Sequence, residues 1–127
     1  MITFQMEPMI YISLALNILV LIPIVILMSI KSPIVDQTWG AFTAARGILM
    51  SIYLSILVVS VLLLFKPAPA FVAALLLVQV VYKLTTPFTV GKFSHPVVIS
   101  NIVISAVHIA TLVTIYLALG ERLFQTS

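Results

Sequence analysis

Four long apolar stretches constrain this chain more than any other feature of its sequence. They cover residues 9–30, 40–65, 70–86 and 96–119. A bilayer core about 30 Å thick needs about 20 apolar residues in a helix, whose backbone groups are satisfied within the segment. The sequence therefore predicts an all-α fold, an integral membrane four-helix bundle in which residues 1–127 form a single transmembrane domain.

The composition excludes several classes of soluble protein. Hydrophobic residues make up 63% of the chain and charged residues 7%, whereas roughly a quarter of the residues of a soluble domain are charged. This excludes a soluble enzyme and a nucleic-acid-binding domain, so no nucleic acid partner is expected. The net charge of +3 comes from few residues, and in such a chain it bears on membrane orientation. Without cysteine, a disulfide or a thiolate metal site cannot form.

Proline residues mark most of the expected helix boundaries. Ser32 and Pro33 are typical of an N-cap and a first helical position, so the second helix is expected to begin near Pro33. Residues Pro33 to Trp39 would then form its interfacial first turn or two, with Trp39 at headgroup depth. Pro87 is expected to end the third helix, because the residue before a proline avoids the α region. His95, at the start of the fourth helix, is expected to cap it or to face solvent.

The third apolar stretch admits two interpretations. It is short, and Gln79, Tyr82 and Lys83 lie near its end. One interpretation is a short span whose lysine reaches toward the interface along its aliphatic stem. The other is a segment that enters the bilayer and bends back. We expect the span.

The basic residues predict an orientation through the positive-inside rule. Four of them lie at or near the membrane face of the first and third connections, and two lie at the opposite face. In that order they are Lys31, Arg46, Lys83 and Lys92, and then Lys66 and Arg122. The sequence therefore predicts a multi-pass integral membrane protein with both termini on the outer side.

The acidic residues argue against catalysis by this chain. Glu7, Asp36 and Glu121 are the only three, and all of them flank the apolar segments. Coupled carriers often place an ionisable group at mid-membrane, and a nucleophile–histidine–acid triad needs a buried acid. No catalytic residue and no metal site are predicted, and an enzymatic activity of the chain's own is not expected.

A polar stripe on the fourth span is the first candidate site. Asn101, Ser105 and His108 follow each other at spacings of four and three residues, so they share one helix face that should contact protein. His108 serves as a haem ligand, a quinone contact or a proton relay in one interpretation, and as a neutral interhelical hydrogen-bonding group in the other. His95 lies about 20 Å away along a helix, so the two histidines cannot ligate one iron.

A basic cluster is the second candidate site, for an anion or a lipid headgroup. Arg46 lies just inside the second span, and Gln79, Tyr82 and Lys83 are expected near the same membrane face. The planar guanidinium is suited to paired oxygen atoms. Alternatively, Arg46 reaches ordinary headgroups. An internal pair with Asp36, ten residues earlier, would require a helix break near Gly40.

Small and polar residues predict where helices pack. Gly47, Ser51 and Ser55 repeat every four residues on the second span, and small residues at that spacing let two helix backbones approach closely. On the first span, Ser13 and Asn17 form a polar pair one turn apart.

The order of these parts resembles the small four-helix membrane proteins of the DoxX-like type. The similarity lies in Arg46-Gly47 near the start of the second span, and in a basic third-span end at Tyr82-Lys83 followed by a loop to Pro96. Some members of that family are subunits of quinone-linked respiratory complexes, which the resemblance implies as a context here. The chain departs from the pattern by lacking the additional glycines and buried acids, so no catalytic residue is carried over.

These patterns favour a small, non-catalytic accessory subunit of a larger integral membrane complex, respiratory or otherwise redox, that binds lipids at its surface. The alternative is a homo-oligomeric carrier or a quinone- or lipid-binding protein, with a polar site around His108 and Arg46. Expected partners are membrane lipids and other membrane subunits. No cofactor is predicted, with haem and quinone kept as alternatives.

Overall fold

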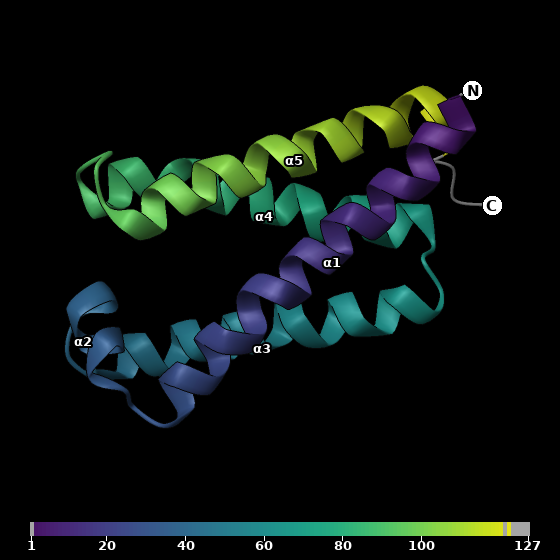
Figure 1. Ribbon diagram of the computed structural model, residues 1–127. Helices are drawn as coiled ribbons and strands as arrows, with labels where there is room; N and C mark the ends of the chain where they lie inside the picture. Colours follow the sequence, from purple (N-terminus) through teal and green to yellow (C-terminus); the bar gives the residue numbers. More distant parts are fainter. Residues whose placement is uncertain (1, 121, 123–127) are drawn as a thin grey trace. The chain divides into compact units, whose positions relative to one another are not determined.

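The computed structural model describes residues 2–120 and 122, and within them the protein is all-α. The five helices are α1 (Ile2–Ser29), α2 (Pro33–Trp39), α3 (Ala44–Phe65), α4 (Pro69–Val90) and α5 (Pro96–Leu119) (Figure 1). All except α2 are long and apolar enough to cross a membrane. The protein is therefore a multi-pass integral membrane protein, and the predicted fold class is confirmed.

A glycine separates the short helix α2 from the second span. Gly40 ends α2 with φ +90° and ψ 171°, a backbone conformation that is essentially restricted to glycine. Its N–H donates to the carbonyl of Asp36 at 3.0 Å. The apolar stretch that begins at residue 40 therefore enters its long helix only at Ala44, and Trp39 lies on a separate helix.

The prediction that Pro87 ends the third helix is wrong. Helix α4 continues through Pro87 to Val90 and ends at Gly91, which has a left-handed conformation with φ +92°. Proline has no N–H to donate to the carbonyl of Lys83, four residues earlier. The Thr86 hydroxyl donates to that carbonyl instead, at 2.6 Å. The carbonyl is thus satisfied, and α4 is one continuous helix that does not bend back.

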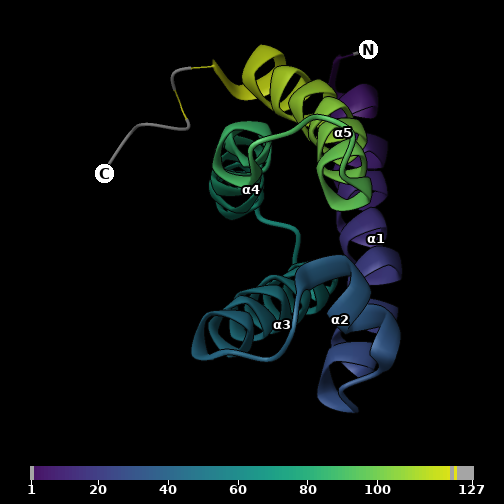
Figure 2. The same cartoon turned by 90° about the vertical axis from the view of Figure 1, so that its left-hand side faces the viewer.

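The chain divides into two compact units. The first, which we call the α4/α5 unit, contains the start of α1 up to Ser13 together with α4 and α5. Helices α4 and α5 run antiparallel and side by side (Figures 1 and 2). Their buried side chains, apolar and polar together, recur every three or four residues, as on any amphipathic helix pair. The apolar ones carry the packing between the two helices. They include Val72, Leu76, Val80, Val98, Ile104 and Ile115.

The second unit, the α2/α3 unit, is Leu14–Phe65 and contains the rest of α1, α2 and α3. Val35 of α2 is fully buried. Trp39 at the end of α2 contacts Tyr53 of α3 edge to face, with 6.5 Å between ring centroids. In the same unit, Asn17 of α1 donates to Ser60 of α3 at 3.1 Å. A polar link and aromatic packing therefore hold these helices together.

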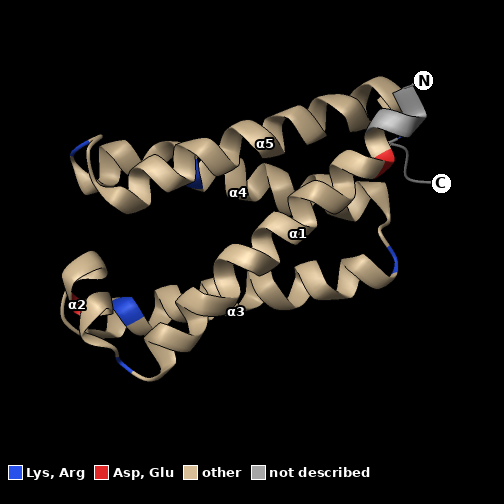
Figure 3. Cartoon of the chain, viewed as in Figure 1, with Lys and Arg blue, Asp and Glu red and all other residues tan. Residues whose placement is uncertain are grey.

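Most side chains of the four spans face outward. Between 22% and 33% of each span is buried inside the structure, and charged residues are sparse along the long helices (Figure 3). In water, this amount of exposed apolar surface would promote aggregation. Its extent fits a chain surrounded by hydrocarbon or by other apolar subunits.

Candidate functional site

A continuous polar face runs along the α4/α5 unit, and we call it the polar lane. On α4 it consists of residues spaced four and three apart, and on α5 it continues one turn beyond the predicted stripe. Residue 13 of α1 joins it from the same unit. Its members are Ser13, Gln79, Lys83, Thr86, Asn101, Ser105, His108 and Thr111, all buried except the half-buried Thr86.

One end of the polar lane is a hydrogen-bonded ring around Lys83. The Lys83 ammonium donates to Asn101 Oδ1 at 3.3 Å and to the Tyr82 hydroxyl at 3.2 Å. Asn101 Nδ2 donates to the Thr86 hydroxyl at 3.2 Å, and that hydroxyl donates to the carbonyl of Lys83. These contacts join α4 to α5 through charged and amide groups, which suit oxygen-rich ligands or interhelical linkage.

The other end of the polar lane joins α5 to α1. His108 Nδ1 lies 3.0 Å from the Ser13 hydroxyl, and that hydroxyl lies 2.6 Å from Thr111 Oγ1. Thr111 Oγ1 also lies 3.1 Å from the carbonyl of Met9. His108 is completely buried, and its contact with Ser13 is the kind of interhelical hydrogen bond that links spans in a bilayer.

Two side chains between these ends have polar atoms without a partner. Gln79 Nε2 and Ser105 Oγ make no hydrogen bond in the structure, although the exposed fractions of the two residues are 1% and 0%. Leaving a buried polar group unsatisfied costs about 1–3 kcal/mol. Most native polar groups avoid that cost, so these two atoms require a physical explanation.

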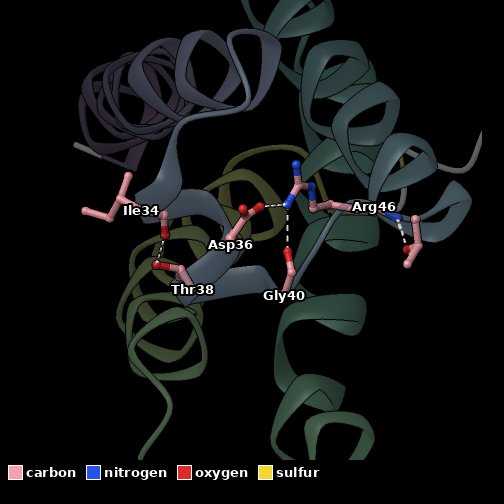
Figure 4. Close-up of polar contacts among 6 residues, drawn as sticks. Ile34, Asp36, Thr38, Gly40 and Arg46 are labelled. Atoms are coloured by element: carbon pink, nitrogen blue, oxygen red, sulfur yellow. Dashed lines mark hydrogen bonds and ion pairs between the residues drawn. The ribbon is translucent and has the colours of Figure 1, made fainter.

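Arg46 belongs to the α2/α3 unit and is held by the turn that follows α2. Its Nη1 atom donates to Asp36 Oδ1, with which it forms an ion pair, and to the carbonyl of Gly40 at 2.6 Å (Figure 4). Its guanidinium carbon lies 5.3 Å from the centre of the Phe42 ring. Asp36 and Arg46 are ten residues apart and would lie on different sides of a continuous helix. The break at Gly40 brings them together, as their spacing in the sequence required.

The structure places the predicted site residues in two groups. Gln79, Tyr82 and Lys83 share the α4/α5 unit with the α5 stripe, and Lys83 contacts Asn101 directly. Arg46 lies in the other unit and is engaged by Asp36. Sequence reasoning missed Thr86 and Thr111, which lie one turn beyond Lys83 and His108 on the same helix faces. That spacing was the signal available for both.

The small residues of α3 lie away from its buried face. Ser51 and Ser55 are exposed, and the Ser55 hydroxyl donates to the carbonyl of Ser51 at 2.8 Å. Around Gly47, the nearest side-chain atoms to an added Cβ belong to Phe42, at 3.7 and 3.8 Å. The buried residues of α3 are Arg46, Tyr53, Ile56, Ser60 and Leu63. The stripe Gly47, Ser51 and Ser55 is thus on the opposite side of the helix.

An apolar groove of about 370 Å³ lies between the start of α4 and the end of α5. Its lining includes Ala70, Ala73 and Ala74 from α4, and Leu112 and Tyr116 from α5. Its size falls within the range of small-molecule sites, and its lining is suited to a hydrocarbon chain. Within the described residues, no group of three or more histidine and acidic side chains is placed to hold a metal ion; Glu121 lies outside them.

Comparisons with protein-family models, with curated proteins and with solved structures found no match to this chain.

Proposed function

We propose that the protein is a small accessory subunit of a larger integral membrane assembly, with lipids bound in the gaps between subunits. The observation that carries this proposal is the outward stripe Gly47, Ser51 and Ser55, which lies opposite the buried face of α3. Small residues at this spacing allow a second helix to approach closely, and van der Waals packing then drives association.

Three further features support the proposal. Two-thirds or more of each span faces outward, which leaves room for neighbouring subunits. The alanine-lined groove of the α4/α5 unit is suited to an acyl chain at such a junction. The likeness in order of parts to DoxX-like proteins, some of which are respiratory subunits, points to a redox assembly as the context.

Enlarging the outward stripe should disrupt the assembly without unfolding the chain. In Ser51→Leu and Ser55→Leu, the added side chains fill the space that a partner helix would occupy, so the recovery of associated subunits should fall at least about threefold. The measurement is native mass spectrometry after extraction in mild detergent. Ala45→Leu is the matched control, because it adds the same bulk at an exposed position near the start of α3.

Two results would contradict the proposal. Wild-type protein extracted only as a free monomer or homo-oligomer would show that no larger assembly exists. Equal recovery of partners with Ser55→Leu and with Ala45→Leu would show that the stripe is not the contact surface.

The proposed orientation places both termini on the outer side of the membrane. Since the chain has no cysteine, a single cysteine introduced by Lys66→Cys or by Lys92→Cys shows, by its labelling, on which side of the membrane its connection lies. In intact cells, a membrane-impermeant maleimide should label the Lys66→Cys protein at least about tenfold more than the Lys92→Cys protein, because the basic residues favour the inner side for the third connection. The reverse preference would invert the topology.

A further inference from the structure

Hydrogen-bond donors exceed acceptors around Lys83 in the polar lane. The Lys83 ammonium has three hydrogens, and two protein oxygens accept from it, at 3.2 and 3.3 Å. Gln79 Nε2 donates to nothing, and neither does Ser105 Oγ. The exposed fractions of these three residues are 5%, 1% and 0%. These hydrogen-bond donors are thus buried, and some of their hydrogens have no acceptor in the protein.

The three side chains lie on facing surfaces of two antiparallel helices. Gln79 is one turn before Lys83 on α4, and Ser105 is one turn after Asn101 on α5. Because the Lys83–Asn101 hydrogen bond aligns the two helices at that level, Gln79 and Ser105 lie at the next level along the same seam. The unused donors are therefore neighbours of the lysine.

The positive charge of Lys83 has no carboxylate partner among the described residues. Of the acidic side chains among the described residues, Asp36 forms an ion pair with Arg46 in the other unit. The other, Glu7, is exposed. Ionisable residues within spans typically face a partner charge or a ligand. An anionic group would balance this charge and accept the unused hydrogens.

We propose that Lys83, Gln79 and Ser105 bind the anionic oxygen headgroup, carboxylate or phosphate, of a membrane amphiphile. Lys83 is seven residues from the end of α4, about 10 Å along the helix. A ligand that reaches this depth must carry a hydrocarbon tail into the bilayer. The site goes beyond the proposed accessory role and does not depend on which subunits the chain contacts.

If Lys83, Gln79 and Ser105 serve only to hold the two helices together, a different result is expected. If a small rotation paired Gln79 with Ser105, both would be satisfied without a ligand, and removing Lys83 would affect stability alone. The experiment therefore measures ligand retention and folding separately.

The test is competition between matched amphiphiles on the purified chain in mild detergent, read by native mass spectrometry. Oleate is compared with oleyl alcohol, and phosphatidylglycerol with phosphatidylcholine. Wild type should retain the anionic member of at least one pair at least about tenfold more than the neutral or zwitterionic member. Preference in the first pair only assigns a carboxylate, preference in the second only assigns a phosphate, and preference in both assigns the shared anionic oxygen.

Variants locate the site. Lys83→Met should abolish the preference, and Gln79→Leu and Ser105→Ala should each reduce it at least about threefold. Lys92→Met, which removes an exposed lysine of the same unit, should retain it. Helix content by circular dichroism checks folding. If Lys83→Met does not fold, Gln79→Leu and Ser105→Ala decide, because each removes a buried donor atom, Gln79 Nε2 or Ser105 Oγ, that makes no hydrogen bond in the structure.

Several results would overturn the proposal. These are the absence of any preference in both pairs, a preference unchanged in Lys83→Met or in the two smaller variants, and decylubiquinone retained as well as oleate. The last result would indicate a neutral carbonyl ligand in place of an anion.

Discussion

Replacing Asp36 with alanine should destabilise the α2/α3 unit by about 2 kcal/mol, because it removes the carboxylate that pairs with Arg46. The side chain of Arg46 is 5% exposed and that of Asp36 is 55% exposed. The variant therefore leaves a buried guanidinium with the carbonyl of Gly40 and the ring of Phe42. This expected loss of stability is smaller than for a fully buried ion pair, since water screens the exposed carboxylate.

The measurement is equilibrium unfolding in mixed micelles, followed by the fluorescence of Trp39, the single tryptophan of the chain. A matched control is Glu7→Ala, which removes an exposed acid from the other unit. In the double variant Asp36→Ala/Arg46→Met no unpaired charge is left, so part of the lost stability should return. Strict additivity of the two single substitutions would show that the pair has no energetic coupling.

Replacing Thr86 with valine, which has nearly the same shape, should destabilise the α4/α5 unit by about 2 kcal/mol. The hydroxyl of Thr86 satisfies the carbonyl of Lys83, which Pro87 cannot reach, and accepts from Asn101 Nδ2. Valine leaves both groups without this partner in a half-buried position. The measurement is the free energy of unfolding in mixed micelles, followed by circular dichroism.

Two further variants isolate the role of the proline. Pro87→Ala restores a backbone N–H that can donate to the carbonyl of Lys83, so Thr86→Val/Pro87→Ala should recover about 1 kcal/mol of the loss. Thr85→Val is the matched control. The Thr85 hydroxyl donates to the carbonyl of Tyr82 from an exposed position. That carbonyl also has the backbone N–H of Thr86, four residues after Tyr82, as a helical donor. If Thr85→Val cost as much as Thr86→Val, the account of the continuous helix would be wrong.

The apolar runs predicted the spans because hydrocarbon selects for segment length and internal hydrogen bonding. The fourth span, from Pro96 to Leu119, has the expected bounds. His95 caps it, accepting from the N–H of Val97 through Nδ1 at 3.1 Å. A proline at a first helical position is a local signal, which is why it could be predicted from sequence.

Pro87 shows where the same local logic fails. A proline inside a helix removes one hydrogen bond, and whether the helix ends depends on whether another group takes its place. Here the replacement is the neighbouring Thr86, whose hydroxyl is held by Asn101 of the next helix. Spacing within one segment cannot reveal that second contact.

The sequence by itself determined that this chain crosses a membrane four times and that Asn101, Ser105 and His108 share a helix face, since both follow from hydropathy and helix periodicity. Only the tertiary structure decided the partners: Ser13 for His108, Asn17 for Ser60, and Asp36 for Arg46 across the break at Gly40. A helix period specifies which side chains point the same way. Which polar group meets them depends on how separate helices pack, because many donors and acceptors along a span satisfy the same periodicity.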